Sequence, residues 1–183
     1  MGGELEAACR ALARGGVVAY PTEGVYGLGC DPADKAAVER ILRLKGRAAA
    51  KGLILIADRM DALEPWLAPL DDATRARLAE TWPGPVTWLL PAAPGTGPEL
   101  RGEHETLAVR VTAHPPAAAL CAAWGGPLVS TSANRAGEEP ARDAATVAAV
   151  FGDGVDVIID APIGALAGPT TIRDGRTGRV LRG

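Results

Sequence analysis

The chain has 183 residues, which is long enough for one well-buried domain and short for two. With 48% hydrophobic and 22% charged residues, its composition is that of an ordinary globular protein. Its formal net charge of -3 argues against sequence-independent nucleic-acid binding as the main task, because proteins with that task carry a basic excess; a local basic patch stays open.

No apolar run approaches the length needed to span a membrane, and the N-terminus lacks the basic-then-apolar layout of a signal peptide. The cysteines, Cys9, Cys30 and Cys121, are odd in number, far apart and without CxxC spacing. We therefore expect a cytoplasmic protein with reduced cysteines and no membrane contact.

The first third of the chain alternates helical and strand periodicity. Residues 4–14 have apolar side chains at helical spacing, and a glycine pair ends that helix. Asp31 as N-cap and Pro32 as first residue are expected to begin the next helix. Strands are predicted at 17–20 and at 53–57, the second buried on both faces because it has no polar alternation.

In the middle of the chain, Asp58 and Asp71 are expected to cap two helices, the later one ending near Trp82. Residues 91–104 are rich in Pro and Gly, which predicts an exposed excursion. Further elements expected here are strands at 86–90 and 106–111 and a helix at 115–124.

In the last third, an aliphatic strand at 127–129 leads into a polar cluster, and Asp143 is expected to cap a helix ending near Phe151. A strand is predicted at 155–159, and a hairpin of residues 170–173 and 180–182 closes the chain. Because strands and helices alternate without a repeat or linker, residues 1–183 are expected to form a single α/β domain with a twisted sheet covered by helices.

Three cations, Lys45, Arg47 and Lys51, lie between the second helix and the strand at 53–57. Such a loop can hold a polyanion at the edge of a rigid sheet, and in an extended loop Lys45 and Arg47 point the same way. The alternative is that Arg43, Lys45 and Arg47 only complement the negative end of the helix dipole and are otherwise solvated. The loop alone does not decide between the two.

Residues 130–134 (STSAN) place three hydroxyls and an amide directly after a strand. Ligands of open α/β sheets bind at the carboxyl ends of strands, so this cluster is a candidate binding site. The alternative is a turn with Asn134 in a left-handed conformation.

Arg110 lies inside an apolar strand, where a guanidinium is costly unless it pairs with a carboxylate or a ligand anion. The alternative is a structural ion pair. Thr22 and Glu23 offer one hydroxyl and one carboxylate in a Gly-rich loop, and Glu23 is equally consistent with a solvated or capping acid. None of these residues alone names a reaction.

A cysteine nucleophile and a protein-held metal are both poorly supported. Nothing in the spacing joins Cys30 to His104 or His114, and a buried cysteine usually acts as a small hydrophobe. Two histidines and scattered cysteines form no cluster of metal ligands.

Many short motifs nevertheless occur in one order along nearly the whole chain. They are Tyr20-Pro21-Thr22-Glu23, Tyr26-Gly27-Leu28-Gly29, Lys45-x-Arg47, Lys51-Gly52-Leu53, Trp82-Pro83-Gly84-Pro85-Val86-Thr87, Ala108-Val109-Arg110-Val111, His114-Pro115, Ser130-Thr131-Ser132-Ala133-Asn134 and Leu181-Arg182. Together they resemble the YrdC/TsaC family of L-threonylcarbamoyladenylate synthases, in its short form without an appended C-terminal domain.

The resemblance implies an enzyme that makes threonylcarbamoyl-AMP and pyrophosphate from L-threonine, bicarbonate or CO2 and ATP, with Mg2+ accompanying ATP. The product would serve tRNA threonylcarbamoyladenosine synthesis, at the adenosine following the anticodon, through downstream tRNA threonylcarbamoyl-transfer proteins. The implied fold is YrdC-like and similar to dihydroxybutanone-phosphate synthase: a mixed sheet flanked by helices, with a large cationic cavity.

The resemblance also implies roles for individual side chains. Thr22, Ser130 and Thr170 would contact threonine, and Arg110 would bind its carboxylate as a planar fork. Lys45 and Arg47, the expected catalytic residues, would anchor the triphosphate and stabilise its developing charge. The nucleotide would be placed by Thr106, Ser132, Asn134 and Arg182. No protein ligand for a metal is implied.

Two positions depart from longer members of the family. Those members carry a histidine at about the position of Ile56 and a Ser-Thr pair where this chain has Thr170-Thr171. The threonine pocket is therefore expected to be built differently here.

Two rival functions remain at this stage. One is a factor that binds tRNA or double-stranded RNA, or acts in ribosome maturation, through Lys45, Arg47 and Lys51 with Arg40 and Arg43, although no aromatic residues interleave with these cations for stacking. The other is an enzyme that handles a carbamoyl or acyl phosphate on a similar fold.

Overall fold

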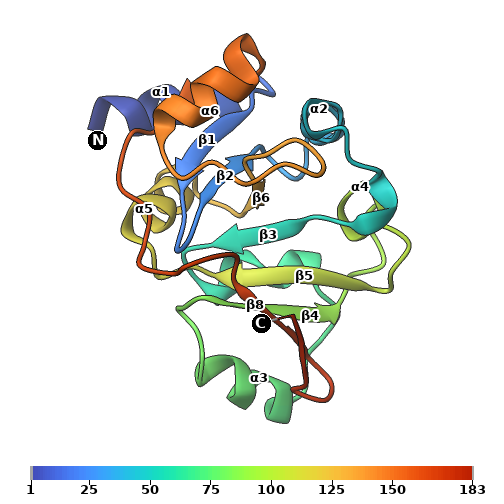
Figure 1. Cartoon of the computed structure of the whole chain (residues 1–183). Coiled ribbons are helices and arrows are strands. Elements are labelled where there is room, and N and C mark those ends of the chain that lie inside the picture. The colour runs from blue at the N-terminus through green and yellow to red at the C-terminus, as the bar shows by residue number, and fades with distance from the viewer. Residues whose placement is uncertain (1, 183) are drawn as a thin grey trace.

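The computed structural model describes residues 2–182, which fold around a nine-stranded mixed β-sheet (Figure 1). Across the sheet the strands run in the order β7-β1-β2-β6-β3-β5-β4-β8-β9. The pairs β1/β7, β3/β5 and β4/β8 are parallel, and the other neighbours are antiparallel. The strands are β1 (Val18–Pro21), β2 (Tyr26–Gly29), β3 (Ile54–Ala57), β4 (Val86–Pro91), β5 (Thr106–Val111), β6 (Leu128–Ser132), β7 (Val157–Ile158), β8 (Thr171–Asp174) and β9 (Val180–Arg182).

Helices supply apolar side chains to two cores. In one, Leu12 and Leu120 pack with Tyr20 and Ile56 of the sheet; in the other, α2 and α6 pack with Leu55 and its neighbours. No helix within residues 2–182 combines the length and the apolar character needed to cross a bilayer. The α-helices are α1 (Gly2–Leu12), α2 (Lys35–Lys45), α3 (Asp72–Ala79), α4 (Pro98–Arg101), α5 (Pro115–Trp124) and α6 (Ala144–Phe151), and the short 3-10 helices are η1 (Ala49–Lys51), η2 (Met60–Ala62), η3 (Glu64–Trp66) and η4 (Gly152–Gly154).

The central strand β3 is buried on both faces, as predicted. Leu55 and Ala57 belong to one core and Ile56 to the other, because successive side chains of a strand point to opposite faces. The strand lies between β5, to which it is parallel, and β6, to which it is antiparallel. The α/β class, the mixed sheet and the flanking helices are thus confirmed.

Three further predictions agree closely with the structure. Strand β5 and helix α5 have the predicted bounds. Asp143 caps α6 by accepting a hydrogen bond from the amide of Thr146 at 2.7 Å. The closing hairpin forms between β8 and β9, with an irregularity in register at Ile172/Arg173.

The predicted start of the second helix was wrong. Helix α2 begins at Lys35, and its N-cap is Asp34, whose Oδ1 accepts from the amide of Ala37 at 3.1 Å. Asp31 instead closes a local turn by accepting from the amide of Ala33 at 2.9 Å. A short Asp side chain serves either structure equally well, so the sequence could not separate them.

Asp58 was also wrongly assigned as a helix cap. The chain after it forms only η2 and η3, because Pro65 prevents a continuous helix, and Asp58 pairs with Arg59 at 2.9 Å. Asp71 does cap α3, accepting from the amide of Thr74 at 2.7 Å, but that helix ends at Ala79, before Trp82.

Three loop predictions also need correction. Residues 91–104 include α4, in which Leu100 is buried. The carbonyl of Leu100 accepts a hydrogen bond from the amide of Leu53 at 2.7 Å. Ser130 and Ser132 lie within β6 rather than after it. Lys45 is the last residue of α2, not part of the loop that follows.

Candidate functional site

A cavity of about 400 Å3 lies beside the loop of residues 22–25 and the start of β2, and it is lined by side chains of β5, β6 and β9. It gathers most of the predicted site residues, although they come from distant parts of the chain. Those that line it are Thr22, Arg47, Thr106, Arg110, Ser130, Ser132, Thr170 and Arg182. The predicted threonine-binding and nucleotide-binding side chains therefore share one space.

The lining of this cavity is rich in cations. Its cationic side chains are those of Arg47, Lys51, Arg101, Arg110 and Arg182. Of the ion pairs formed between residues 2–182, only that of Arg110 with Glu23 involves one of these cations. A space with this excess of positive charge favours an anionic ligand.

The hydroxyls at one end are brought together by a glycine. Thr22 donates its hydroxyl to the carbonyl of Val25 at 2.7 Å, which fixes the side chain and leaves its oxygen free to accept. A Cβ on Gly27 would lie 3.3 Å from Oγ of Ser130 and 3.4 Å from Cγ2 of Thr22. The missing side chain at position 27 lets these two residues approach each other, and both line the cavity.

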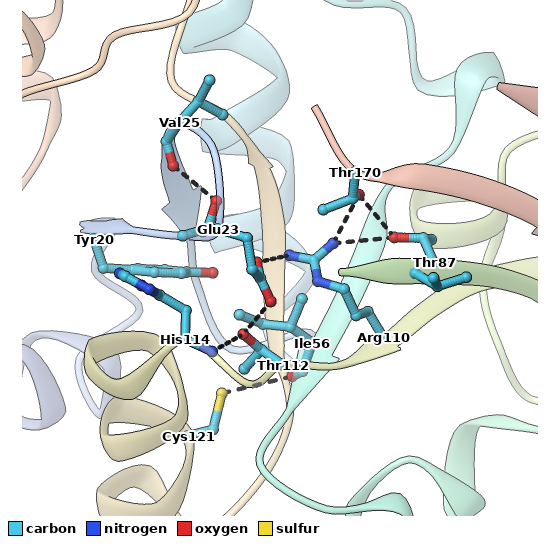
Figure 2. A network of polar contacts seen from close by, with 12 residues as sticks. Tyr20, Glu23, Val25, Ile56, Thr87, Arg110, Thr112, His114, Cys121 and Thr170 are labelled. Atoms are coloured by element: carbon cyan, nitrogen blue, oxygen red, sulfur yellow. Dashed lines mark hydrogen bonds and ion pairs between the residues drawn. The ribbon is translucent and has the colours of Figure 1, made fainter. Parts of the chain in front are cut away.

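Arg110 lies at the centre of a buried polar network (Figure 2). Its Nη1 donates to the hydroxyls of Thr87 at 3.0 Å and Thr170 at 3.2 Å. Its Nη2 is 3.4 Å from Oε2 of Glu23, and its Nε has no partner within residues 2–182. The guanidinium is thus fixed by Thr87 of β4 and by Thr170 and Glu23 of two loops.

Glu23 is not the solvated or capping acid that was one interpretation of the sequence. Its side chain is 9% exposed and forms an ion pair with Arg110. Its Oε1 accepts from the hydroxyl of Thr112 at 2.7 Å, whereas Oε2 has no hydrogen-bond donor within residues 2–182. An arginine inside an apolar strand predicts a carboxylate partner, and in the structure Glu23 is that partner.

Arg47 and Arg182 face the same cavity from different elements. Arg47 donates from Nη2 to the carbonyl of Gly52 at 3.0 Å, and Arg182 from Nη2 to the carbonyl of Thr170 at 3.1 Å. Burial, and then repulsion by Arg182, lowers the pKa of Arg47. Burial, and then repulsion by Arg110, lowers the pKa of Arg182. Uncompensated guanidiniums close enough to repel one another form a ready site for polyphosphate.

Lys45 and Asn134 do not line the cavity as the structure has it. The ammonium of Lys45 is buried and donates to the carbonyl of Ser132, to the carbonyl of Asn134 at 2.8 Å and to its Oδ1 at 3.3 Å. Burial, followed by repulsion from Arg47, lowers the pKa of Lys45 to about 8. Asn134 in turn accepts from the hydroxyl of Ser132 at 2.6 Å. These two residues brace the wall behind Ser132, and their direct contact with nucleotide stays a prediction.

Several lining residues were not predicted. They are Gly24, Arg101, His104 and Gly168, whereas Lys51, one of the three cations after the second helix, and Thr131, from the cluster at 130–134, were expected candidates and also line the cavity. Arg101 carried no sequence signal, because it lies in a stretch expected to be an exposed excursion. Its Nε donates to the carbonyl of Thr96 at 3.1 Å, so α4 is tied to that loop.

One of the two positions that depart from longer family members, Ile56, lies outside the cavity. Ile56 is fully buried in the core beneath α1 and α5. Thr170, the other departure, lines the cavity and shares its hydroxyl with Thr87 and Arg110. The cavity wall at this end is therefore built from threonine hydroxyls.

The observations weigh against the two alternatives of cysteine chemistry and a broad basic patch. Cys30 and Cys121 are buried, which raises the pKa of both thiols, that of Cys121 to about 12. Arg40 pairs with Asp156 at 2.7 Å, and Arg43 lies 3.9 Å from Glu39. Two of the cations that the RNA-binding interpretation requires, Arg40 and Arg43, are thus already paired with acidic side chains.

Comparison with known proteins places this geometry in context. Residues 10–183 match the model of the Sua5/YciO/YrdC family, described as "Telomere recombination". A threonylcarbamoyl-AMP synthase of Chromohalobacter salexigens is 61% identical over 175 residues, covering 96% of this chain and 94% of that protein.

Two solved structures resemble the chain as a whole. The structure of P. abyssi Sua5 complexed with L-threonine superposes with a TM-score of 0.87 at 32% identity, covering 93% of this chain and 50% of that one. E. coli YciO superposes with a TM-score of 0.83 at 30% identity, covering 97% of this chain and 87% of the other.

Proposed function

The chain belongs to the Sua5/YciO/YrdC family, and from that premise we propose that it is an L-threonylcarbamoyladenylate synthase. The reaction joins L-threonine, bicarbonate or CO2 and ATP to give threonylcarbamoyl-AMP and pyrophosphate. The product would enter tRNA threonylcarbamoyladenosine synthesis through downstream transfer proteins in the cytoplasm. High identity to a protein of that name, along nearly its whole length, supports the proposal.

One structural observation carries it: a single cavity joins an end rich in hydroxyls, with a fixed guanidinium, to an end with uncompensated cations. The first end suits an α-amino acid, whose carboxylate needs a planar donor and whose side chain needs small polar contacts. The second suits a triphosphate. An enzyme that adenylates a modified amino acid needs both ends in one space.

At the amino-acid end, Arg110, which lines the cavity, would bind the carboxylate of threonine. Thr22, Ser130 and Thr170 would contact the rest of the substrate. L-threonine is the ligand of the P. abyssi protein, which is consistent with this assignment.

At the nucleotide end, Arg47 and Arg182 would hold the phosphates, with Thr106 and Ser132 placing the nucleotide. Lys45 and Asn134 would support Ser132 from behind, and Lys45 would reach phosphate only by giving up its present acceptors. Fixed cations of this kind stabilise charge that develops on the phosphates without having to reorganise.

The chemistry follows from bringing the two ends together. The amine nitrogen of threonine bonds to CO2 and loses a proton, which gives a carbamate. A carbamate oxygen then attacks the α-phosphorus of ATP, the bond from the α-phosphorus to the bridging oxygen breaks, and pyrophosphate leaves. Alignment of the two substrates in the cavity supplies much of the rate enhancement.

Mg2+ would arrive with ATP. Within residues 2–182 no three His, Cys, Asp or Glu side chains group into a metal site, so the phosphates and water would supply its ligands. Its charge would add to that of Arg47 and Arg182 opposite the leaving pyrophosphate.

A threonine-dependent assay tests the proposal. The protein is incubated with ATP, Mg2+ and bicarbonate, with or without L-threonine, and pyrophosphate is measured beside an active synthase. Release that requires L-threonine is expected. Release that ignores threonine, or no release while the control is active, would refute it. Tight, strongly salt-dependent RNA binding without this activity would favour an RNA-binding factor instead.

A further inference from the structure

The cavity contains a charge asymmetry that the proposed reaction leaves unexplained. Of its cations, Arg110 alone has an acidic partner within residues 2–182, the buried carboxylate of Glu23 at 3.4 Å. Arg47 and Arg182 donate only to backbone carbonyls. One end of the cavity is therefore close to neutral, whereas the other keeps its positive charge.

The two ends are close enough for this difference to matter. Thr170 links them, because its hydroxyl accepts from Arg110 at 3.2 Å and its carbonyl accepts from Arg182 at 3.1 Å. The pKa of Arg182 is lowered in part by Arg110, so the two guanidiniums repel each other. Without Glu23, positive charge would extend from Arg47 to Arg110, and a polyphosphate could occupy either end.

We propose that Glu23 determines which ligand binds at each end of the cavity: by neutralising Arg110, it excludes polyphosphate from the amino-acid end. L-threonine is a zwitterion with no net charge, so it binds a neutral end through hydrogen bonds at little electrostatic cost. A polyphosphate carries several negative charges, is repelled by Glu23 and is attracted to Arg47 and Arg182. Glu23 does not line the cavity, so it acts through Arg110 as a positioning and specificity residue.

The structure of the Glu23 site supports a fixed rather than a mobile charge. Oε1 is held by the hydroxyl of Thr112 at 2.7 Å, and the amide of His114 donates to that same hydroxyl oxygen at 3.2 Å (Figure 2). The carbonyl of Glu23 accepts from the amide of Leu166 at 3.0 Å, so the backbone is tied to a second segment. A side chain held at both points cannot turn away when a ligand enters.

The inference rests on the proposed function for the identity of the amino acid, and Glu23→Gln tests it. This variant keeps the size and the acceptor for Thr112 but removes the charge. By calorimetric titration, it is expected to bind tripolyphosphate about tenfold more tightly than the wild type does, because one nearby negative charge is lost. Tripolyphosphate should also compete with L-threonine in this variant, and it should not compete in the wild type.

A gain in affinity is the decisive readout, because damage to the fold does not tighten binding. Glu64→Gln is the matched control: it removes an acid that pairs with Arg75 at 2.9 Å on the surface, and it should leave tripolyphosphate binding unchanged. Glu23→Asp keeps the charge and should stay close to wild type. If Glu23→Gln does not fold, the double variant Glu23→Gln/Arg110→Gln, which leaves no unpaired buried charge, should bind tripolyphosphate no more tightly than wild type.

The outcomes separate this inference from the proposed function. Unchanged or weaker tripolyphosphate binding by folded Glu23→Gln, in a protein whose wild type is active with threonine, overturns the role of Glu23 and leaves the function standing. Tighter binding by the double variant also overturns it. A wild type that neither binds nor uses L-threonine refutes both.

Discussion

The most informative perturbation is the removal of Lys45, since its sequence motif and its structural position point to different roles. By resemblance it anchors phosphate. In the structure its ammonium donates to the carbonyls of Ser132 and Asn134, and it does not line the cavity. The variants Lys45→Met and Arg47→Met remove one cation each and keep an unbranched apolar stem, so their comparison separates anchoring from bracing.

The magnitude follows from the acceptors that each variant leaves without a donor. Lys45→Met removes three hydrogen bonds of a buried ammonium. The carbonyl of Ser132 keeps the amide of Asn134 as a donor at 3.0 Å, and Oδ1 of Asn134 keeps the hydroxyl of Ser132 at 2.6 Å, so the carbonyl of Asn134 is the acceptor left most exposed to the loss. A buried polar group left unsatisfied costs about 1–3 kcal/mol. Burial of the ammonium is itself unfavourable and lowers the pKa of Lys45. Removing this buried charge therefore offsets part of the cost. We expect a net loss of about 2 kcal/mol in the free energy of unfolding. Arg47→Met loses one bond, to Gly52, and should cost about 1 kcal/mol or less.

The assay is denaturant unfolding of both variants, with ATP kinetics measured in parallel. Both variants should raise the KM for ATP, Arg47→Met by losing a phosphate contact and Lys45→Met by loosening Ser132. A Lys45→Met protein as stable as wild type but with impaired ATP use would contradict the bracing role. It would make Lys45 a direct phosphate anchor.

Three other predictions follow from single contacts. The free energy of unfolding of the wild type relative to Lys45→Met should rise between about pH 8 and 10.5. The reason is that the folded protein releases the proton of Lys45 near pH 8, whereas the unfolded chain keeps it to near pH 10.5. Denaturant unfolding of both proteins at each end of this range measures the rise, and a constant difference would argue against the lowered pKa. Thr170→Val removes one of the acceptors of the Arg110 guanidinium, so the KM for L-threonine should rise about tenfold while that for ATP changes little. Equal rises in both KM values would refute the place of Thr170 at the amino-acid end. Gly24→Ala would put a Cβ 2.1 Å from the carbonyl oxygen of Gly168, so thermal unfolding should show a loss of about 1–3 kcal/mol, whereas Gly3→Ala, with no atom within 4 Å, should show none.

Much of the fold could be predicted because its signals are local. The apolar run of β3, the Asp143 cap and the hairpin of β8 and β9 each depend on a few adjacent residues. The failures at Asp31 and Asp58 arose where one residue type serves two local structures. An Asp can close a turn as readily as it caps a helix, and only packing further along the chain decides between them.

Which residues form the site could largely be predicted from the sequence, but what each of them contacts within the site could not. Most expected residues line one cavity because the motifs mark strand ends and loops that the sheet topology brings together. The burial of Lys45, the pairing of Glu23 with Arg110 and the presence of Arg101 are long-range outcomes. They depend on which elements meet, and no spacing in the sequence encodes that.

The central claim, that one cavity joins threonine to ATP through a carbamate, is tested most directly with labelled bicarbonate. The protein is given ATP, Mg2+, L-threonine and 13C-bicarbonate, and the products are analysed by mass spectrometry. The account predicts threonylcarbamoyl-AMP that carries one 13C, formed in equal amount with pyrophosphate. Pyrophosphate without the labelled adduct, or an adduct without the label, would contradict it.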